Sequence, residues 1–87
     1  MGMTVPSPHI VQGAKPSERE MDALAEYVLT ASHKEAARNL DMAESTVKNH
    51  LVNLRAKTGT LTTFQLVYVL RRELQEHPRL VGWTPSA

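Results

Sequence analysis

The chain has 87 residues, a formal net charge of +1 and no cysteine. This length suits one domain with a small core, which buries roughly 60–65% of the surface that the unfolded chain exposes. The absence of cysteine from the sequence excludes disulfides, thiolate metal sites and cysteine nucleophiles, and it is compatible with a reducing cytoplasm, where we expect the protein to reside. No apolar run reaches the ~18–20 residues of a membrane span, so no membrane partner is expected.

The charges are unevenly distributed along the chain. Residues 16–44 carry seven acids and three bases, whereas residues 45–72 carry five bases and no acid. A basic half of this kind favours a polyanionic partner, although a solvated helical face would also explain it. No nucleophile has a neighbouring base, and the histidines lack the spacing of metal ligands: His9, His33, His50 and His77. The sequence therefore predicts no enzyme, metal site or cofactor.

Residues 1–15 contain Pro6, Pro8 and Gly13 without a regular apolar spacing. This composition predicts a flexible N-terminal arm. We expect a helical domain over residues 16–76 and a C-terminal tail over residues 77–87. In the tail, the lone Trp83 favours a packing anchor folded back on the domain, although it would also fit an extension of a dimer contact.

The first predicted helix covers residues 17–29. Ser17 and Glu20 have the spacing of a capping box, in which each side chain bonds the backbone amide of the other residue. Met21, Leu24 and Val28 repeat at helical spacing and predict its buried face. The acids of the outer face lack a paired histidine, so we interpret them as surface charges rather than catalytic carboxylates: Glu18, Asp22 and Glu26.

The second helix is predicted over residues 33–40, with Ser32 as its N-cap and Glu35 at the capping-box position. Ala36 and Ala37 are small enough to let another helix cross closely. The amides at the start of this helix are suited to hold a DNA phosphate together with three side chains: Ser32, His33 and Lys34. For His33, a purely structural role in the cap is equally compatible.

The third helix is predicted over residues 44–58, after a turn at residues 41–44, and Gly59 ends it. Val47, Leu51 and Leu54 form its buried stripe. The outward face holds amides, cations and a valine but no carboxylate: Ser45, Lys48, Asn49, Val52, Asn53 and Arg55. Asparagine can read adenine, lysine can read guanine, and valine can touch the thymine methyl group. This face therefore predicts DNA contact through a helix-turn-helix, with a protein-binding surface as the alternative.

The fourth helix is predicted over residues 62–76, with a third capping box at Thr62 and Gln65 and a stop at His77 and Pro78. Four apolar residues are expected to close the core: Leu66, Val67, Leu70 and Leu74. The remaining positions are more apolar than a solvent face requires: Tyr68, Val69, Arg72 and Gln75.

Four motifs follow one another in fixed order: Ser-Glu-Arg-Glu from Ser17, His-Lys-Glu-Ala-Ala from His33, Thr-Val-Lys-Asn-His from Thr46, and Lys-Thr-Gly from Lys57. In this order and register, residues 16–67 resemble the LuxR-type (GerE-like) helix-turn-helix family. Its patterns are Thr/Ser-x-Arg-Glu, Asn-Lys-Glu-Ile-Ala, Thr-Val-Lys-x-His and Lys-Leu-Gly. The resemblance implies an all-α, four-helix domain that binds double-stranded DNA, here expected as a stand-alone domain.

Carried over position by position, the resemblance implies base contacts from Lys48, Asn49 and Val52. It implies phosphate contacts from six residues: Ser32, Lys34, Ser45, Thr46, His50 and Lys57. For His50, a role in helix packing is an equal alternative. The family commonly dimerises through the fourth helix, which implies a homodimer contact here at three residues: Tyr68, Val69 and Arg72.

The chain departs from the family pattern at three positions. Thr30 stands where the family has a glycine, Ala43 where it has a serine or threonine helix cap, and Thr63 where it often has an arginine. The missing cap is expected to cost about 1 kcal/mol of helix stability. These changes affect the expected affinity for DNA more than the expected fold.

Taken together, the sequence predicts a sequence-specific transcriptional regulator that reads a two-fold symmetric site as a homodimer. We expect its control through its own concentration, through a regulatory protein that blocks the fourth helix, or through the tails. Two alternatives remain: a promoter-reading module similar to part of a sigma factor, which works with RNA polymerase, and a helical adaptor that binds a protein instead of DNA.

Overall fold

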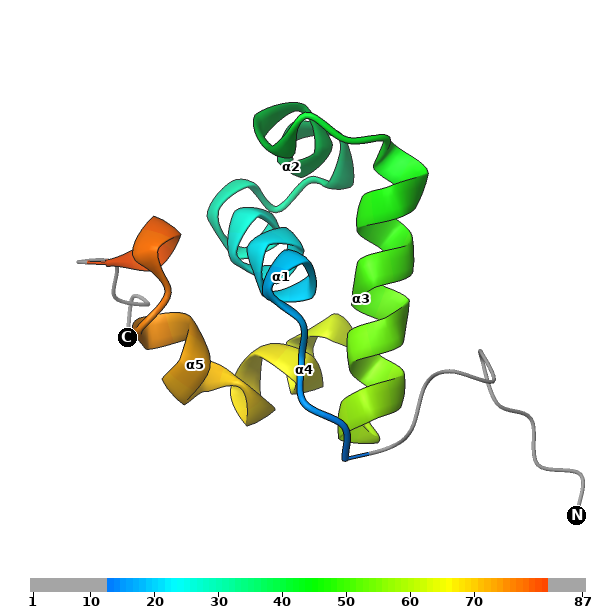
Figure 1. The fold of residues 1–87 in the computed structure, drawn as a ribbon, viewed down its shortest axis with the longest axis vertical. Helices are drawn as coiled ribbons and strands as arrows, with labels where there is room; N and C mark the ends of the chain where they lie inside the picture. Colours follow the sequence, from blue (N-terminus) through cyan, green and yellow to red (C-terminus); the bar gives the residue numbers. More distant parts are fainter. Residues whose placement is uncertain (1–12, 82–87) are drawn as a thin grey trace, which may run out of the picture.

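The computed structural model describes residues 13–81 and consists of helices and connecting turns (Figure 1). The elements are α1 (Glu18–Thr30), α2 (His33–Leu40), α3 (Glu44–Thr58), α4 (Thr63–Val69), α5 (Arg71–Gln75) and a short 3-10 helix, η1 (Pro78–Leu80). The predicted all-α fold is confirmed. Within the described range, no helix has the length and apolar character needed to cross a membrane. Most of the predicted arm, and Trp83, lie outside the described residues.

The predicted capping box of α1 is present. The Ser17 hydroxyl accepts a hydrogen bond from the Glu20 amide at 3.1 Å, and the Glu20 carboxylate accepts one from the Ser17 amide at 2.9 Å. Two of the free amides at the helix start are therefore satisfied by side chains three residues apart in the chain, which fixes where α1 begins.

The other two predicted capping boxes are only half formed. Ser32 and Thr62 cap α2 and α4 by accepting from the amides three residues on, both at 3.1 Å. The amide of Ser32, however, lies 3.3 Å from the hydroxyl of Thr30, and Gln65 accepts from the amide of Leu61 at 2.8 Å. At α2 the amide of the cap residue therefore bonds Thr30 instead of Glu35, and at α4 Gln65 bonds the residue before the cap instead of the cap itself.

The turns after α1 and α2 each contain a left-handed residue that is not glycine. These residues are Ala31 and Asp41, with φ of 56° and 55°. Thr30, where the family has its glycine, is instead the last residue of α1, and its hydroxyl donates to the carbonyl of Glu26 at 2.8 Å. The strained position is therefore one residue later than the sequence pattern suggests. Alanine in this conformation costs about 1 kcal/mol, whereas aspartate tolerates it better.

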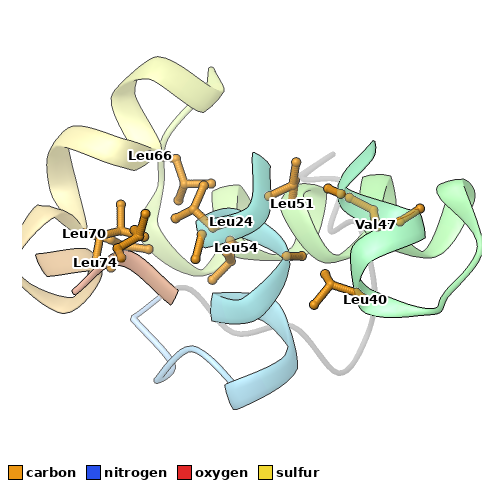
Figure 2. Close-up of a cluster of buried hydrophobic side chains, with 13 residues drawn as sticks. Leu24, Leu40, Val47, Leu51, Leu54, Leu66, Leu70 and Leu74 are labelled. Carbon is orange, nitrogen blue, oxygen red and sulfur yellow. The ribbon is translucent and has the colours of Figure 1, made fainter. Parts of the chain in front are cut away.

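The core is one cluster in which α1 packs against α2, α3 and η1 (Figure 2). The predicted stripe of α3 is confirmed, since Val47, Leu51 and Leu54 are at most 1% exposed. Met21 and Val28 of α1 are partly buried against the cluster, and so is Met42 in the turn between α2 and α3. The leucines that meet in the core come from every helix of the described range: Leu24, Leu40, Leu51, Leu54, Leu66, Leu70, Leu74 and Leu80.

The predicted fourth helix is not continuous. It divides into α4 and α5 at Leu70, whose φ and ψ are −99° and 18°. The side chain of Arg71 donates to the carbonyl of Tyr68 at 2.7 Å, which satisfies an acceptor that the interrupted helix leaves free. The amide of Leu70 still bonds the carbonyl of Leu66, and that of Leu74 the carbonyl of Leu70. The bend therefore keeps the buried row of leucines in register.

The chain beyond α5 packs on α1. His77 lies 2.9 Å from Asp22, Arg79 lies 2.6 Å from Glu26, and Leu80 is 1% exposed. The packed unit therefore extends to Leu80, past the domain end predicted at residue 76. The prediction that Glu26 is a surface charge is wrong: it is 4% exposed and bonds both Arg79 and the amide group of Asn39 in α2.

Candidate nucleic-acid interface

Helices α2 and α3 form a helix-turn-helix. α2 ends at Leu40 and α3 begins at Glu44, so the turn occupies only residues 41–43. The amide of Met42 bonds the carbonyl of Ala37 at 3.0 Å, which closes the end of α2. Ala36 and Ala37 are buried between the two helices, and their small side chains permit the close approach. This short connection fixes the direction of α3 relative to α2.

The outward face of α3 carries the predicted base-contacting residues. Lys48, Asn49 and Val52 are exposed, on the side of the helix opposite the buried stripe. Ser45, one turn before Asn49, is exposed as well, whereas Thr46 and His50 are half-buried at the flanks. All of these side chains lie on one continuous helix of 15 residues, which Figure 1 shows along one side of the molecule. The face is long enough to lie in a major groove.

The exposed end of α3 contains a carboxylate that the sequence interpretation left out of this face. Glu44 lies 3.5 Å from the ammonium group of Lys48, and both side chains are about half exposed. The four-residue spacing of an acid before a lysine was the signal for this pair. The N-terminus of α3 also lacks a side-chain cap at Ala43, as predicted.

The predicted phosphate contacts at the start of α2 have different environments. Lys34 is exposed in the first turn of α2. Ser32 is half-buried, and its hydroxyl is used as the helix cap. His33 lies with its ring 4.7 Å from that of Tyr27, tilted by 30°. Of these three side chains, Lys34 is therefore the one that is open to a polyanion, while His33 packs on α1.

Lys57 does not belong to the exposed basic surface. Its side chain is 12% exposed, and its ammonium group lies 2.7 Å from the carboxylate of Glu20 and 3.3 Å from the carbonyl of Lys15. It joins the end of α3 to the start of α1. This pairing argues against the predicted contact of Lys57 with phosphate, because its charge is already paired within the domain.

The same contact changes the acidity of Glu20. Burial by itself would raise the pKa of this carboxyl group, but the hydrogen bonds from Lys57 and from the Ser17 amide, together with the positive charge of Lys57, outweigh it. The pKa of Glu20 is lowered as a result.

Within residues 13–81, no three histidine, aspartate or glutamate side chains gather in a way that could hold a metal ion.

A second exposed surface covers the outer side of α4. It includes two of the three residues predicted for a dimer contact, Tyr68 and Val69, which are 63% and 47% exposed. The third, Arg72, is exposed on α5. The sequence interpretation missed two residues that are more exposed on this surface, Leu61 and Phe64, at 85% and 83%. Their signal in the sequence was the helical spacing from Leu61 through Phe64 to Tyr68. We call Leu61, Phe64, Tyr68 and Val69 the α4 apolar surface.

Shallow hollows lie on both sides of Phe64. One is lined by Gly59, Thr60 and the outer side chains of α4, and the other by Tyr27, Val28 and Ala31 of α1 with Thr63 and Val67. An exposed aromatic ring between two hollows suits contact with a second protein surface, because an aromatic ring of the partner can enter the hollow beside it.

Comparison with known proteins identifies the domain. The sequence model of the bacterial regulatory proteins of the luxR family matches residues 16–70, which span α1 to the end of α4. No curated protein and no solved structure matches the chain. The matched range contains the complete helix-turn-helix and all four motifs from which the resemblance was inferred. The chain therefore belongs to the LuxR family of bacterial regulatory proteins, and α2, the turn and α3 form its DNA-binding helix-turn-helix.

Proposed function

We propose that the protein is a sequence-specific transcriptional regulator that binds a two-fold symmetric DNA site as a homodimer. The observation that carries this proposal is the exposure of Lys48, Asn49 and Val52 on the outward face of α3, in a domain of a DNA-binding family. In a helix-turn-helix, this helix enters the major groove and its side chains meet the edges of the bases.

Each of the three side chains has a chemical role in base recognition. Lys48 donates to the O6 and N7 atoms of guanine, and Asn49 bonds the N6 and N7 atoms of adenine. Val52, one turn further, packs on a thymine methyl group. Phosphate contacts hold the helix in register and come from residues around this face: Ser32, Lys34, Ser45, Thr46 and His50. Lys57 is not among them, since it pairs with Glu20.

The homodimer is supported by the α4 apolar surface and by the small size of the core. Phe64 and Tyr68 expose most of their rings to solvent, and a second copy of the chain would cover them. With Arg72 at its edge, this contact would present two copies of α3 to half-sites about ten base pairs apart. A regulatory protein that covered the same surface would separate the copies and weaken binding to the full site.

The experiment that tests the function is a selection from random-sequence duplexes with the purified chain at two salt concentrations. Enrichment of a two-fold symmetric sequence is the expected result. Weak, salt-sensitive binding without an enriched sequence would refute sequence-specific recognition and would favour the adaptor alternative. Binding that becomes sequence-specific only with RNA polymerase would favour the promoter-reading alternative.

Variants separate the two kinds of contact. Lys48→Ala should relax the preference at one position by about 1–3 kcal/mol, because the direct contact to a base is lost. Lys34→Ala should weaken all sequences alike and reduce the salt slope by about one. Arg19→Ala, which removes an exposed cation from α1, serves as the charge-matched control and should change neither quantity.

A further inference from the structure

Glu44 is the acid at the head of the outward face of α3. It is the first residue of this helix, and the residues from 45 to 72 include no other acid. Its side chain is 48% exposed, and its carboxylate lies 3.5 Å from the ammonium group of Lys48. Glu44 therefore carries the one negative charge of α3, the helix that the proposed function directs toward a polyanion.

The position of Glu44 on the helix aligns it with the base-reading side chains. Glu44, Lys48 and Val52 follow one another at four-residue intervals, so they form one ridge along α3. Four residues advance a helix by about 6 Å, which corresponds to about two base-pair steps of DNA. The N-terminal residues of a recognition helix are those that reach furthest toward base edges. In the proposed complex, Glu44 would therefore face a base pair about two steps from those that Lys48 contacts.

The contact with Lys48 does not prevent this role. Both side chains are about half exposed, and an exposed pair within one helix is weak in water. Each group can therefore turn to a different partner in a DNA complex. The carboxylate would accept a hydrogen bond from the N4 amino group of cytosine while the ammonium group donates to guanine.

We infer that Glu44 is a specificity-determining residue that reads a cytosine, and this inference rests on the proposed function. The carboxylate acts in two ways. It accepts a hydrogen bond from the one base whose major-groove edge offers the matching amino group in that position, and it repels phosphate wherever that bond is not made. Glu44 thus lowers the affinity for other sequences and sharpens the preference for its own.

The test is a selection from random duplexes with wild-type protein, Glu44→Ala and Glu44→Gln. Wild type should prefer cytosine at one position, on the order of tenfold over the other bases. Glu44→Ala should lose this preference alone, and both variants should bind non-specific duplex more tightly. Glu44→Gln should move the preference to adenine, because a glutamine amide bonds the N6 and N7 atoms of adenine. Preferences that depend on Lys48 should stay.

Glu18→Gln is the matched control. It removes the same charge from the first turn of another helix, where Glu18 is exposed, and it should leave every preference unchanged. Thermal midpoints measured for all variants show that each is folded, which separates base reading from a role of Glu44 at the helix start.

The outcomes distinguish this inference from the function on which it rests. If wild type enriches a site and both Glu44 variants enrich the same site with the same weights, the role of Glu44 is refuted and the proposed function stands. If the Glu44 variants change the base preference at a position where wild type does not prefer cytosine, the assignment of cytosine is refuted. If wild type enriches no sequence, the proposed function fails, and the role of Glu44 fails with it.

Discussion

Replacing Lys57 with methionine should destabilise the domain strongly, because it leaves a buried acid without its partner. Lys57→Met keeps most of the packing of the side chain but removes the ammonium group 2.7 Å from Glu20, whose side chain is only 6% exposed. Breaking a buried pair costs about 3–5 kcal/mol, and an exposed pair at most about 1 kcal/mol. With 12% exposure at Lys57, this pair is closer to the buried case, so we expect a loss of about 2–4 kcal/mol.

The stabilisation that the pair of Lys57 and Glu20 provides should depend on pH in a definite direction. The pKa of Glu20 is lowered in the folded state, so the pair stabilises the fold fully above the unfolded pKa of about 4.3, and the stabilisation is lost as the pH falls through the lower folded value. In Lys57→Met, the hydrogen bond and the positive charge of Lys57 are lost, so the pKa of Glu20 should be higher than in the wild type. The difference in unfolding free energy between wild type and variant should therefore shrink from pH 7 toward pH 3.

The assay is urea denaturation at several pH values, with Glu20→Gln and the double variant completing a double-mutant cycle. The reasoning is refuted if Lys57→Met costs less than about 1 kcal/mol, or if the cycle shows no coupling between the two residues. A large loss of DNA affinity in a fully folded Lys57→Met protein would instead restore the phosphate contact that the structure argues against.

Three further predictions concern other parts of the fold. Ala31→Gly should stabilise the domain by about 1 kcal/mol, because φ is positive at this residue, and Asp41→Gly should stabilise it less. Thermal denaturation of both variants measures these changes in stability. Leu80→Ala should cost about 2–4 kcal/mol in the same assay because Leu80 is buried against the core, and no loss would contradict that packing. Phe64→Ser should shift the protein toward monomer in sedimentation and weaken binding to a full site more than to a half-site, whereas an unchanged mass would exclude Phe64 from the dimer contact.

The starts of the helices and the buried stripe of α3 were predictable because they depend on residues close together in the sequence. Ser17, Ser32 and Thr62 each cap the helix that follows them, and each acts within three residues. The stripe at Val47, Leu51 and Leu54 follows from helical periodicity alone. The exposure of the residues predicted to contact bases follows from the same periodicity, because a buried stripe determines the opposite face.

The corrected features depend on contacts between distant parts of the chain. The pairing of Lys57 with Glu20 joins residues 37 positions apart, and that of Arg79 with Glu26 joins residues 53 apart. Nothing in the local pattern of Glu26 distinguishes it from a surface acid, because its burial is produced by α2 and η1. The break at Leu70 is local and is accompanied by a hydrogen bond from the side chain of Arg71 to the carbonyl of Tyr68, which periodicity does not reveal.

The packing of η1 on α1 has a practical consequence for work with this protein. Figure 1 shows η1 and α3 on opposite sides of α1, whereas Gly13 bonds the carbonyl of Lys57 at the end of α3. The last described residues, at η1, thus lie on the side of α1 away from α3, and a fluorophore, affinity tag or surface linker joined after the C-terminus would follow η1 in the chain rather than the segment beside α3. For binding measurements on immobilised protein, the C-terminus is therefore the better point of attachment.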